Sequence, residues 1–192
     1  ATISADSYMV MVKDAAGCSQ STIIPLTQPE PLVLNVSSTN TLCHGSANGQ
    51  IHVTSASGGT GTFSYSVGGA VYQSSPNFTG LSAGTYSVYV KDVTGCTANT
   101  LVPVAQPTAI TATASVTPAQ CRGYYDGAIE ITASGGVGNY YYSVFGSNYQ
   151  ATNIFPELPA GTYTVRVRDG NNCVYATSVA VTQPATITAS VN

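Results

Sequence analysis

Hydrophobic and polar residues alternate along most of this chain, in short segments separated by glycine, proline and asparagine. Three such segments, at 8–12, 86–90 and 163–167, carry a tyrosine followed by two valines at every second position. Successive side chains of a β-strand point to opposite faces. The tyrosines and valines are therefore predicted to face a core, and the variable residues between them to face solvent or a partner. No segment of ten or more residues has helical periodicity, so an all-β fold is predicted.

These segments belong to an internal repeat. Matching blocks end in Gln-Pro, and the prolines Pro29, Pro107 and Pro184 are 78 and 77 residues apart. Repetition at a fixed period is the signature of tandem architectures. The period predicts four parts, namely the C-terminal part of a truncated upstream repeat at 1–28, complete repeats at 29–106 and 107–184, and the start of a further repeat at 185–192. The chain is thus interpreted as a window on a longer array.

Each complete repeat is predicted to be an immunoglobulin-like β-sandwich. In the first repeat, strand-like segments are placed at 31–36, 49–55, 62–67, 70–73, 76–79, 85–91 and 97–104. Short strands at this spacing, separated by turn residues, are typical of small sandwiches. Proline restricts its own φ and the residue before it, so the Gln-Pro junctions are expected to be stiff. Tandem sandwiches joined in this way predict an extended rod.

Two kinds of turn residue recur in the repeats. The Gly-Gly pairs at 58–59 and 135–136 predict a turn that needs positive φ. Asp14, Asp92 and Asp169 stand where a strand enters a tight turn. Aspartate in this position most often accepts hydrogen bonds from nearby backbone N–H groups, so a structural role is expected for all three.

The cysteines follow the repeat as well. One disulfide in each complete repeat, Cys43–Cys96 and Cys121–Cys173, is the simplest pairing and would require an oxidising compartment. Cys18 corresponds to Cys96 and is left unpaired by truncation. In simple immunoglobulin wiring, however, the members of each pair lie at opposite poles. Cys43 must then lie on an irregular crossing segment, or the topology differs, and free buried thiols are the alternative.

Composition excludes several classes of partner. Charged residues make up 7% of the chain, and five Lys and Arg cannot supply the cationic face that a nucleic-acid binder needs. No apolar run approaches the ~20 residues of a membrane helix, so no membrane insertion is expected in this segment. Scarce lysine with abundant glycine, serine and threonine favours a secreted protein at the cell surface.

No catalytic or zinc site is expected. The histidines, His44 and His52, are replaced by Arg122 and Glu130 in the next repeat, so neither has a repeated role. Catalysis requires a nucleophile or a positioned acid and base, and no such group recurs. The spacing of Cys43 and the two histidines fits no closed zinc site. We therefore expect a protein that is not an enzyme.

No cofactor is expected, although calcium remains an alternative. The candidate oxygen donors are Glu30, Asp92, Asp126, Glu157 and Asp169. Calcium sites usually gather several carboxylates, which are sparse here, and Asn48 takes the place of Asp126 in the other repeat. These observations favour turn formation over metal binding.

Tyrosines are the best candidates for surface binding. The candidates are Tyr124, Tyr125, Tyr141 and Tyr149. Aromatic platforms stack on sugars, and tyrosine is enriched at interfaces. Alternation buries either Tyr140 and Tyr142 together or Tyr141 alone, so part of this group belongs to the core.

The order of motifs resembles the SprB-type repeat. It reads C-x-G, a strand beginning with glycine, S-G-G-x-G-x-Y-x-Y-S, and L-x-A-G-T-Y-x-V-x-V-x-D-x-x-x-C. The matching residues are Cys43/Gly45, Gly49–Val53, Ser57–Ser66 and Leu81–Cys96, then Cys121/Gly123, Gly127–Ile131, Ser134–Ser143 and Leu158–Cys173. This resemblance implies a very large cell-surface adhesin of gliding Bacteroidota, exported by the type IX secretion system.

The predicted function is that of a filament segment that spaces or mediates attachment to surfaces in gliding motility. Its expected partners are a surface polysaccharide or an abiotic substratum, and neighbouring repeats of the same chain. Two alternatives stay open. A carbohydrate-binding module array of a secreted glycan-active protein predicts exposed, coplanar aromatic residues at the same place on each repeat. A self-assembling structural fibre predicts that terminal part-repeats pair between chains.

Overall fold

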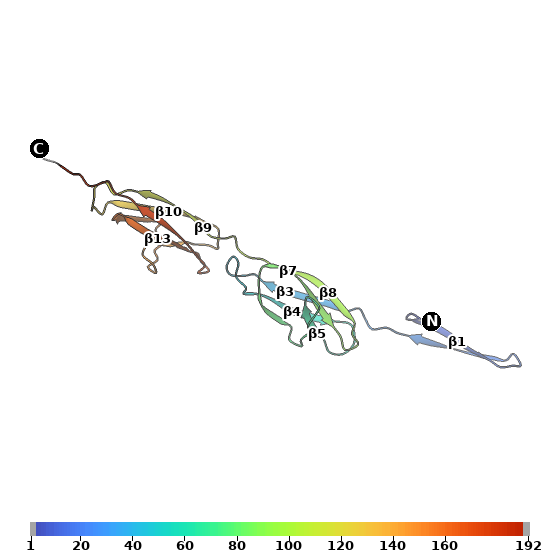
Figure 1. Cartoon of the computed structure of the whole chain (residues 1–192). Helices are drawn as coiled ribbons and strands as arrows, with labels where there is room; N and C mark the ends of the chain where they lie inside the picture. The colour runs from blue at the N-terminus through green and yellow to red at the C-terminus, as the bar shows by residue number, and fades with distance from the viewer. Residues whose placement is uncertain (1–2, 190–192) are drawn as a thin grey trace. The chain divides into compact units, whose positions relative to one another are not determined.

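The computed structural model describes residues 3–189, which form β-strands and no helix (Figure 1). The strands are β1 Asp6–Lys13, β2 Ser19–Leu26, β3 Val33–Thr39, β4 Gly49–Ser57, β5 Ser64–Val67, β6 Asn77–Leu81, β7 Gly84–Lys91, β8 Thr97–Val104, β9 Thr111–Thr117, β10 Gly127–Ser134, β11 Tyr141–Ser143, β12 Ile154–Leu158, β13 Gly161–Arg168 and β14 Val174–Val181. A helix long and apolar enough to cross a membrane is not found in this part of the chain. The predicted all-β fold is confirmed.

The same pair of sheets is built twice. Three-stranded sheets of order β3-β4-β6 and β5-β7-β8 use strands from 29–106, and sheets of order β9-β10-β12 and β11-β13-β14 use strands from 107–184. Strands β1 and β2 form a separate antiparallel ribbon, in which Tyr8 is opposite Ile24. Equivalent positions of the sequence repeat therefore occupy equivalent strands.

One predicted strand, at 70–73, does not form. Gln73 instead makes an isolated bridge with Tyr65, with both backbone N–H···O distances at 2.8–2.9 Å. Its side-chain amide donates to the carbonyls of Ser75 and Asn77, which fixes the turn that leads into β6. Positive φ at Gly68 and Gly69 interrupts the extended conformation just before this segment.

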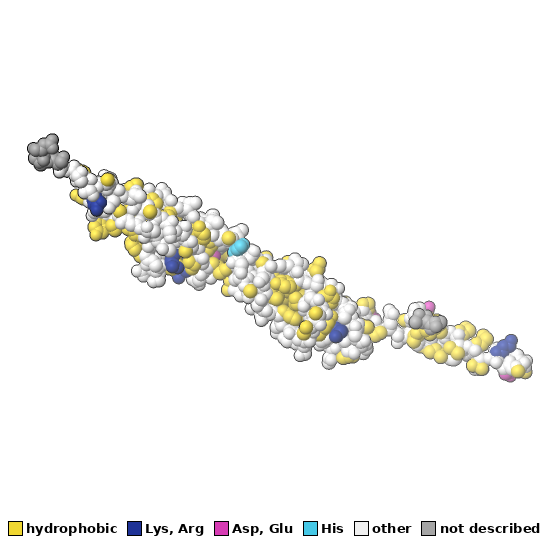
Figure 2. Space-filling view, viewed as in Figure 1, with side chains coloured by type: hydrophobic (Ala, Val, Ile, Leu, Met, Phe, Trp, Pro, Cys, Tyr) yellow, Lys and Arg dark blue, Asp and Glu magenta, His cyan; other side chains and the backbone are white. Residues whose placement is uncertain are grey.

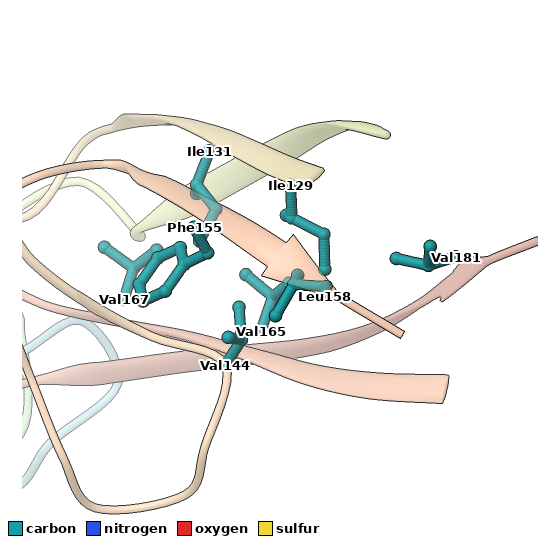
Figure 3. Close-up of a cluster of buried hydrophobic side chains, with 8 residues drawn as sticks. All are labelled: Ile129, Ile131, Val144, Phe155, Leu158, Val165, Val167 and Val181. Atoms are coloured by element: carbon teal, nitrogen blue, oxygen red, sulfur yellow. The ribbon is translucent and has the colours of Figure 1, made fainter. Parts of the chain in front are cut away.

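The core of the C-terminal repeat lies between its two sheets. It is formed by Ile129 and Ile131 of β10, Phe155 and Leu158 of β12, Val165 and Val167 of β13, Val181 of β14, and Val144. Figure 3 shows these side chains pointing toward one another from opposing strands. Both sheets contribute to one cluster, which is the defining property of a sandwich. The predicted alternation is confirmed here, because Val165 and Val167 are fully buried.

The hairpin β1–β2 differs from its two later copies. Val10 and Val12 are 44% and 70% exposed, and Met9 and Met11 on the other face are exposed as well. The prediction that Val10 and Val12 face a core is wrong for residues 3–189, because no second sheet covers this ribbon within them. Alternation predicts which residues share a face, but burial needs an opposing layer.

Contacts divide the described residues into two compact units. One comprises the residues up to Ser37 with His52–Asn77 and Tyr86–Val102. The other comprises Ser38–Ile51, Phe78–Thr85 and the residues from Pro103 onward. The repeat boundaries proposed from the sequence stay predictions, and each unit is treated by itself below.

Candidate functional site

Asp169 closes the hairpin between β13 and β14. Its Oδ1 accepts hydrogen bonds from the backbone N–H groups of Asn171 and Cys173, both at 2.9 Å. Backbone bonds across the turn complete it, with Asp169 N donating to Cys173 O at 3.0 Å. Asn172 takes the left-handed conformation that the turn needs, at φ 64°. The predicted turn-forming role of this aspartate is confirmed.

The other oxygen of Asp169 holds the Gly-Gly turn. Val137 N donates to Asp169 Oδ2 at 2.9 Å, and the carboxylate is 1% exposed. Gly135 and Gly136 have φ of 78° and 65°, as predicted. A Cβ on Gly135 would lie 2.0 Å from the carbonyl oxygen of Ala109, so no side chain fits there. One buried carboxylate thus joins two turns that are distant in sequence.

Asp92 forms the same arrangement in the first complete repeat. Its Oδ1 accepts from the N–H groups of Thr94 and Cys96 at 2.9 Å and from the Thr94 hydroxyl at 2.7 Å, and its Oδ2 accepts from Thr60 N at 2.9 Å. These hydrogen bonds, the one from the Thr94 hydroxyl above all, lower the pKa of Asp92. The carboxylate is therefore held ionised by donors of its own repeat.

Three of the five carboxylates considered for calcium, Asp92, Asp126 and Asp169, accept hydrogen bonds from backbone N–H groups. Asp126 Oδ1 accepts from Gln120 N at 3.1 Å, and Asn48 Oδ1 makes the matching bond with Leu42 N at 3.0 Å. An amide thus replaces the carboxylate without loss of the bond. Among residues 3–189, no group of three or more His, Cys, Asp or Glu side chains is placed to hold a metal ion. The expectation of no cofactor, with calcium as the alternative, stays an untested prediction.

The loop that contains Cys43 is held by a glutamine. Gly45 N donates to Gln106 Oε1 at 2.8 Å, and Thr41 N donates to Ala105 O at 3.0 Å. In the next copy, Gly123 N donates to Gln183 Oε1 at 2.9 Å. The glutamine of each Gln-Pro pair therefore has a structural role. The recurrence of Gln-Pro in the sequence was the signal for this role, but from the sequence alone it predicted only a stiff junction.

The disulfide pairing differs from the predicted one. Cys43 is bonded to Cys173, which is 130 positions later in the sequence. Their Cα atoms are 5.7 Å apart, and both residues lie in the second compact unit. Cys18, Cys96 and Cys121 are exposed free thiols. The predicted pairs Cys43–Cys96 and Cys121–Cys173 are therefore wrong. Beside the bond, the Asn171 side-chain amide donates to the carbonyl of Leu42 at 2.9 Å.

Strand length explains why the predicted pairs do not form. In the C-terminal repeat, the Cys121 loop is held by Gln183, just beyond the end of β14, whereas Cys173 precedes the start of β14. This eight-residue strand spans about 26 Å, at roughly 3.3 Å per residue. Disulfide formation needs Cα atoms within about 7 Å. The warning from immunoglobulin wiring, that each pair lies at opposite poles, was correct.

Comparison with known families identifies the repeat. The family model of the SprB repeat matches residues 35–70 and 113–147. This chain contains two SprB-type repeats. The matched stretches include the Cys43 and Cys121 loops and both Gly-Gly turns. No curated protein matches the chain. Among solved structures, the amphioxus IgVJ-C2 molecule aligns with 95% of this chain and 92% of its own, at 16% identity and a TM-score of 0.31.

Two of the candidate tyrosines flank an arginine in the second SprB repeat. The Arg168 guanidinium lies 4.5 Å from the ring centre of Tyr149 and 5.4 Å from that of Tyr141. Tyr140 and Tyr142 pack against the core. Of the two arrangements that alternation allowed, the structure therefore has the one in which Tyr140 and Tyr142 face inward and Tyr141 faces outward. The first SprB repeat keeps part of this arrangement, because Lys91 lies 4.0 Å from the ring centre of Tyr72.

The other two candidates, Tyr124 and Tyr125, lie elsewhere. They belong to the Cys121 loop, beside Gln183, and are 61% and 68% exposed. Tyr141 is instead opposite Arg168, at the other end of the β13–β14 hairpin. The four tyrosines therefore do not form one surface, and the first SprB repeat has Ser46 and Ala47 in the loop positions. Within residues 29–184, no pair of exposed aromatic residues recurs at the same place in both repeats.

Proposed function

We propose that this chain is a segment of a large extracellular adhesin or filament, in which SprB repeats space or mediate attachment of gliding cells to surfaces. The match to the SprB repeat at two successive places is the observation that carries this proposal. The disulfide supports the extracellular location, because such bonds persist in oxidising compartments. Export by type IX secretion and coupling to gliding are parts of the same proposal.

A structural rather than enzymatic role is consistent with the polar groups that recur. The carboxylates of Asp92 and Asp169 are occupied by backbone N–H donors within their own turns. The recurring glutamines, Gln106 and Gln183, hold loops in the same way. The groups present in both repeats thus maintain the fold. A surface that varies on such a scaffold suits a module used for spacing.

Attachment to a surface polysaccharide or an abiotic substratum is proposed for the whole protein. In the second SprB repeat, Tyr141, Arg168 and Tyr149 would offer an aromatic and cationic surface to such a partner. Because this surface is not the same in the first repeat, the spacing role is favoured over an array of identical carbohydrate-binding modules. The proposed array would hold its adhesive parts away from the cell as an extended rod.

The test uses cells that produce the protein. Fab fragments raised against this chain should label intact, non-permeabilised cells and reduce their attachment to glass. Labelling that appears only after permeabilisation would contradict the surface location. Labelling of intact cells with unchanged attachment, both with Fab and after deletion of residues 29–183 from the gene, would contradict the attachment role.

A further inference from the structure

A groove lies beside the Cys43–Cys173 disulfide, within the second compact unit. One side is formed by the Cys43 loop, through Cys43 and His44. The other side is formed by the segment 107–110, the Gly-Gly turn at Gly136, the Asp169 turn and the residues 173–175. The loop around Cys43, here called the Cys loop, and the turn from Asp169 to Cys173, here called the Asp turn, therefore meet at this groove. The disulfide joins them.

Two further grooves each contain half of this arrangement. One is formed by residues 120–122 and 184–187, which correspond by the repeat to 42–44 and 107–110 and include the free Cys121. The other is formed by 28–32, Gly59 and 96–98, which correspond to the opposite side and include the free Cys96. Within residues 3–189 the first lacks an Asp turn and the second lacks a Cys loop. Together they reproduce the completed groove.

The isoleucine that ends each of the segments 107–110 and 184–187 supports this comparison. Ile110 packs against the core of the C-terminal repeat, beside the completed groove. Its counterpart in the half groove, Ile187, is 95% exposed. A large apolar side chain is placed where its equivalent covers a sandwich. A sandwich of the same kind, placed at Cys121, would cover Ile187.

The Cys121 loop already has the conformation of its cross-linked counterpart. Tyr124 N donates to Cys121 O at 3.2 Å, as Ser46 N does to Cys43 O. The bond from Gly123 N to Gln183 and the bond from Gln120 N to Asp126 also have equivalents around Cys43. Formation of the bond would therefore need little reorganisation of this loop.

We propose that every SprB repeat is cross-linked to its neighbours and none within itself. Cys121 bonds to the Asp-turn cysteine of a SprB repeat that follows in the same polypeptide. Cys96 bonds to the Cys-loop cysteine of a repeat that precedes it. The occupant of each half groove is thus an adjacent repeat, joined as Cys43 is joined to Cys173.

The bond forms by thiol–disulfide exchange with a small-molecule disulfide such as oxidised glutathione. The Cys121 thiolate attacks this disulfide, forms a mixed disulfide and releases one glutathione thiolate. The thiolate of the Asp-turn cysteine then attacks the sulfur of Cys121 and releases the second. Two protein thiols lose two protons and two electrons, and one oxidised glutathione becomes two reduced molecules.

The test adds one repeat to the full chain. Residues 1–183 are followed by residues 107–192, and the protein is folded in a glutathione redox buffer, digested without reduction and mapped by mass spectrometry. We expect Cys121 of the first copy to be bonded to Cys173 of the added copy. The bond between Cys43 and Cys173 of the first copy serves as the internal control for folding.

The alternatives have distinct products. When the control bond is present, a bond between Cys121 and Cys173 of one copy, or an alkylatable Cys121 in the first copy, overturns the proposal. A disulfide-linked dimer through Cys121 and Cys96 also overturns it, because the occupant would then be a second chain. The variant Cys121→Ser in the first copy should leave Cys173 of the added copy fully alkylatable and keep the control bond.

Discussion

The hairpins β1–β2 and β13–β14 share one turn but differ in their surroundings. Cys18 N donates to Asp14 Oδ1 at 2.9 Å in the first, and Cys173 N makes the same bond with Asp169 Oδ1 in the second. The strands behave differently, since Val12 is 70% exposed and its counterpart Val167 is fully buried. Figure 2 shows hydrophobic side chains along the surface of β1–β2. The turn forms from five consecutive residues, whereas burial depends on a distant sheet.

The two aspartates illustrate the same division. Both accept a bond from a cysteine N–H four residues away, which is local. Asp169 also accepts a bond from Val137 N, 32 residues earlier in the chain. An isolated two-stranded hairpin is marginally stable in water, so the local turn bonds alone give the first hairpin little stability. Variants placed in pairs, one in each hairpin, measure how much stability the tertiary contacts add.

The largest effect is expected from the disulfide, which only the β13–β14 hairpin has. The pair Cys43→Ser and Cys173→Ser opens a loop of 130 residues, and the chain-entropy model assigns about 5 kcal/mol to its closure. Guanidinium unfolding followed by circular dichroism should show a loss approaching this value. The control Cys18→Ser removes an exposed thiol of the other hairpin and should leave the transition unchanged. Equal losses in both variants would contradict the assignment.

The next effect is expected at the turn aspartates. Asp169→Ala removes a buried carboxylate and leaves the N–H groups of Asn171, Cys173 and Val137 without their acceptor, which should cost about 3 kcal/mol in unfolding free energy. Asp14→Ala removes the exposed Cys18 bond and should cost less than about 1 kcal/mol. Urea unfolding of both variants checks the difference. Similar costs would mean that the contact with Val137 adds no stability.

A smaller contrast is expected at the valines. Val167→Ala removes two methyl groups from the core and leaves a cavity, which should destabilise the protein by about 2 kcal/mol. Val12→Ala affects a side chain that is mostly in water and should change stability by less than about 0.5 kcal/mol. Thermal unfolding distinguishes the two results. A comparable loss for Val12→Ala would show that this hairpin is covered in solution.

Local and alternating features were predictable from the sequence, and pairing between distant segments was not. The strands, the positive φ of the Gly-Gly turns and the role of Asp169 follow from patterns within about ten residues. Cys96 and Cys173 stand at identical positions of their repeats, so the local sequence does not show which of them bonds to Cys43. The choice depends on which ends of the two repeats lie next to each other. The bonds of Gln106 and Gln183 were missed for the same reason, since loop and glutamine are about 60 residues apart.

The smallest effect is expected at the left-handed position of the two turns. Gly17 occupies it in the first hairpin at φ 94°, and Asn172 in the second at φ 64°. Asparagine adopts this conformation more readily than other residues with a side chain. Asn172→Gly should therefore change stability by less than about 1 kcal/mol, because relief of backbone strain is offset by the entropy of glycine in the unfolded chain. Asn172→Ala should destabilise by about 1 kcal/mol. Thermal unfolding of both variants tests this order, and an Asn172→Ala protein as stable as Asn172→Gly would show that the turn tolerates the left-handed conformation without cost.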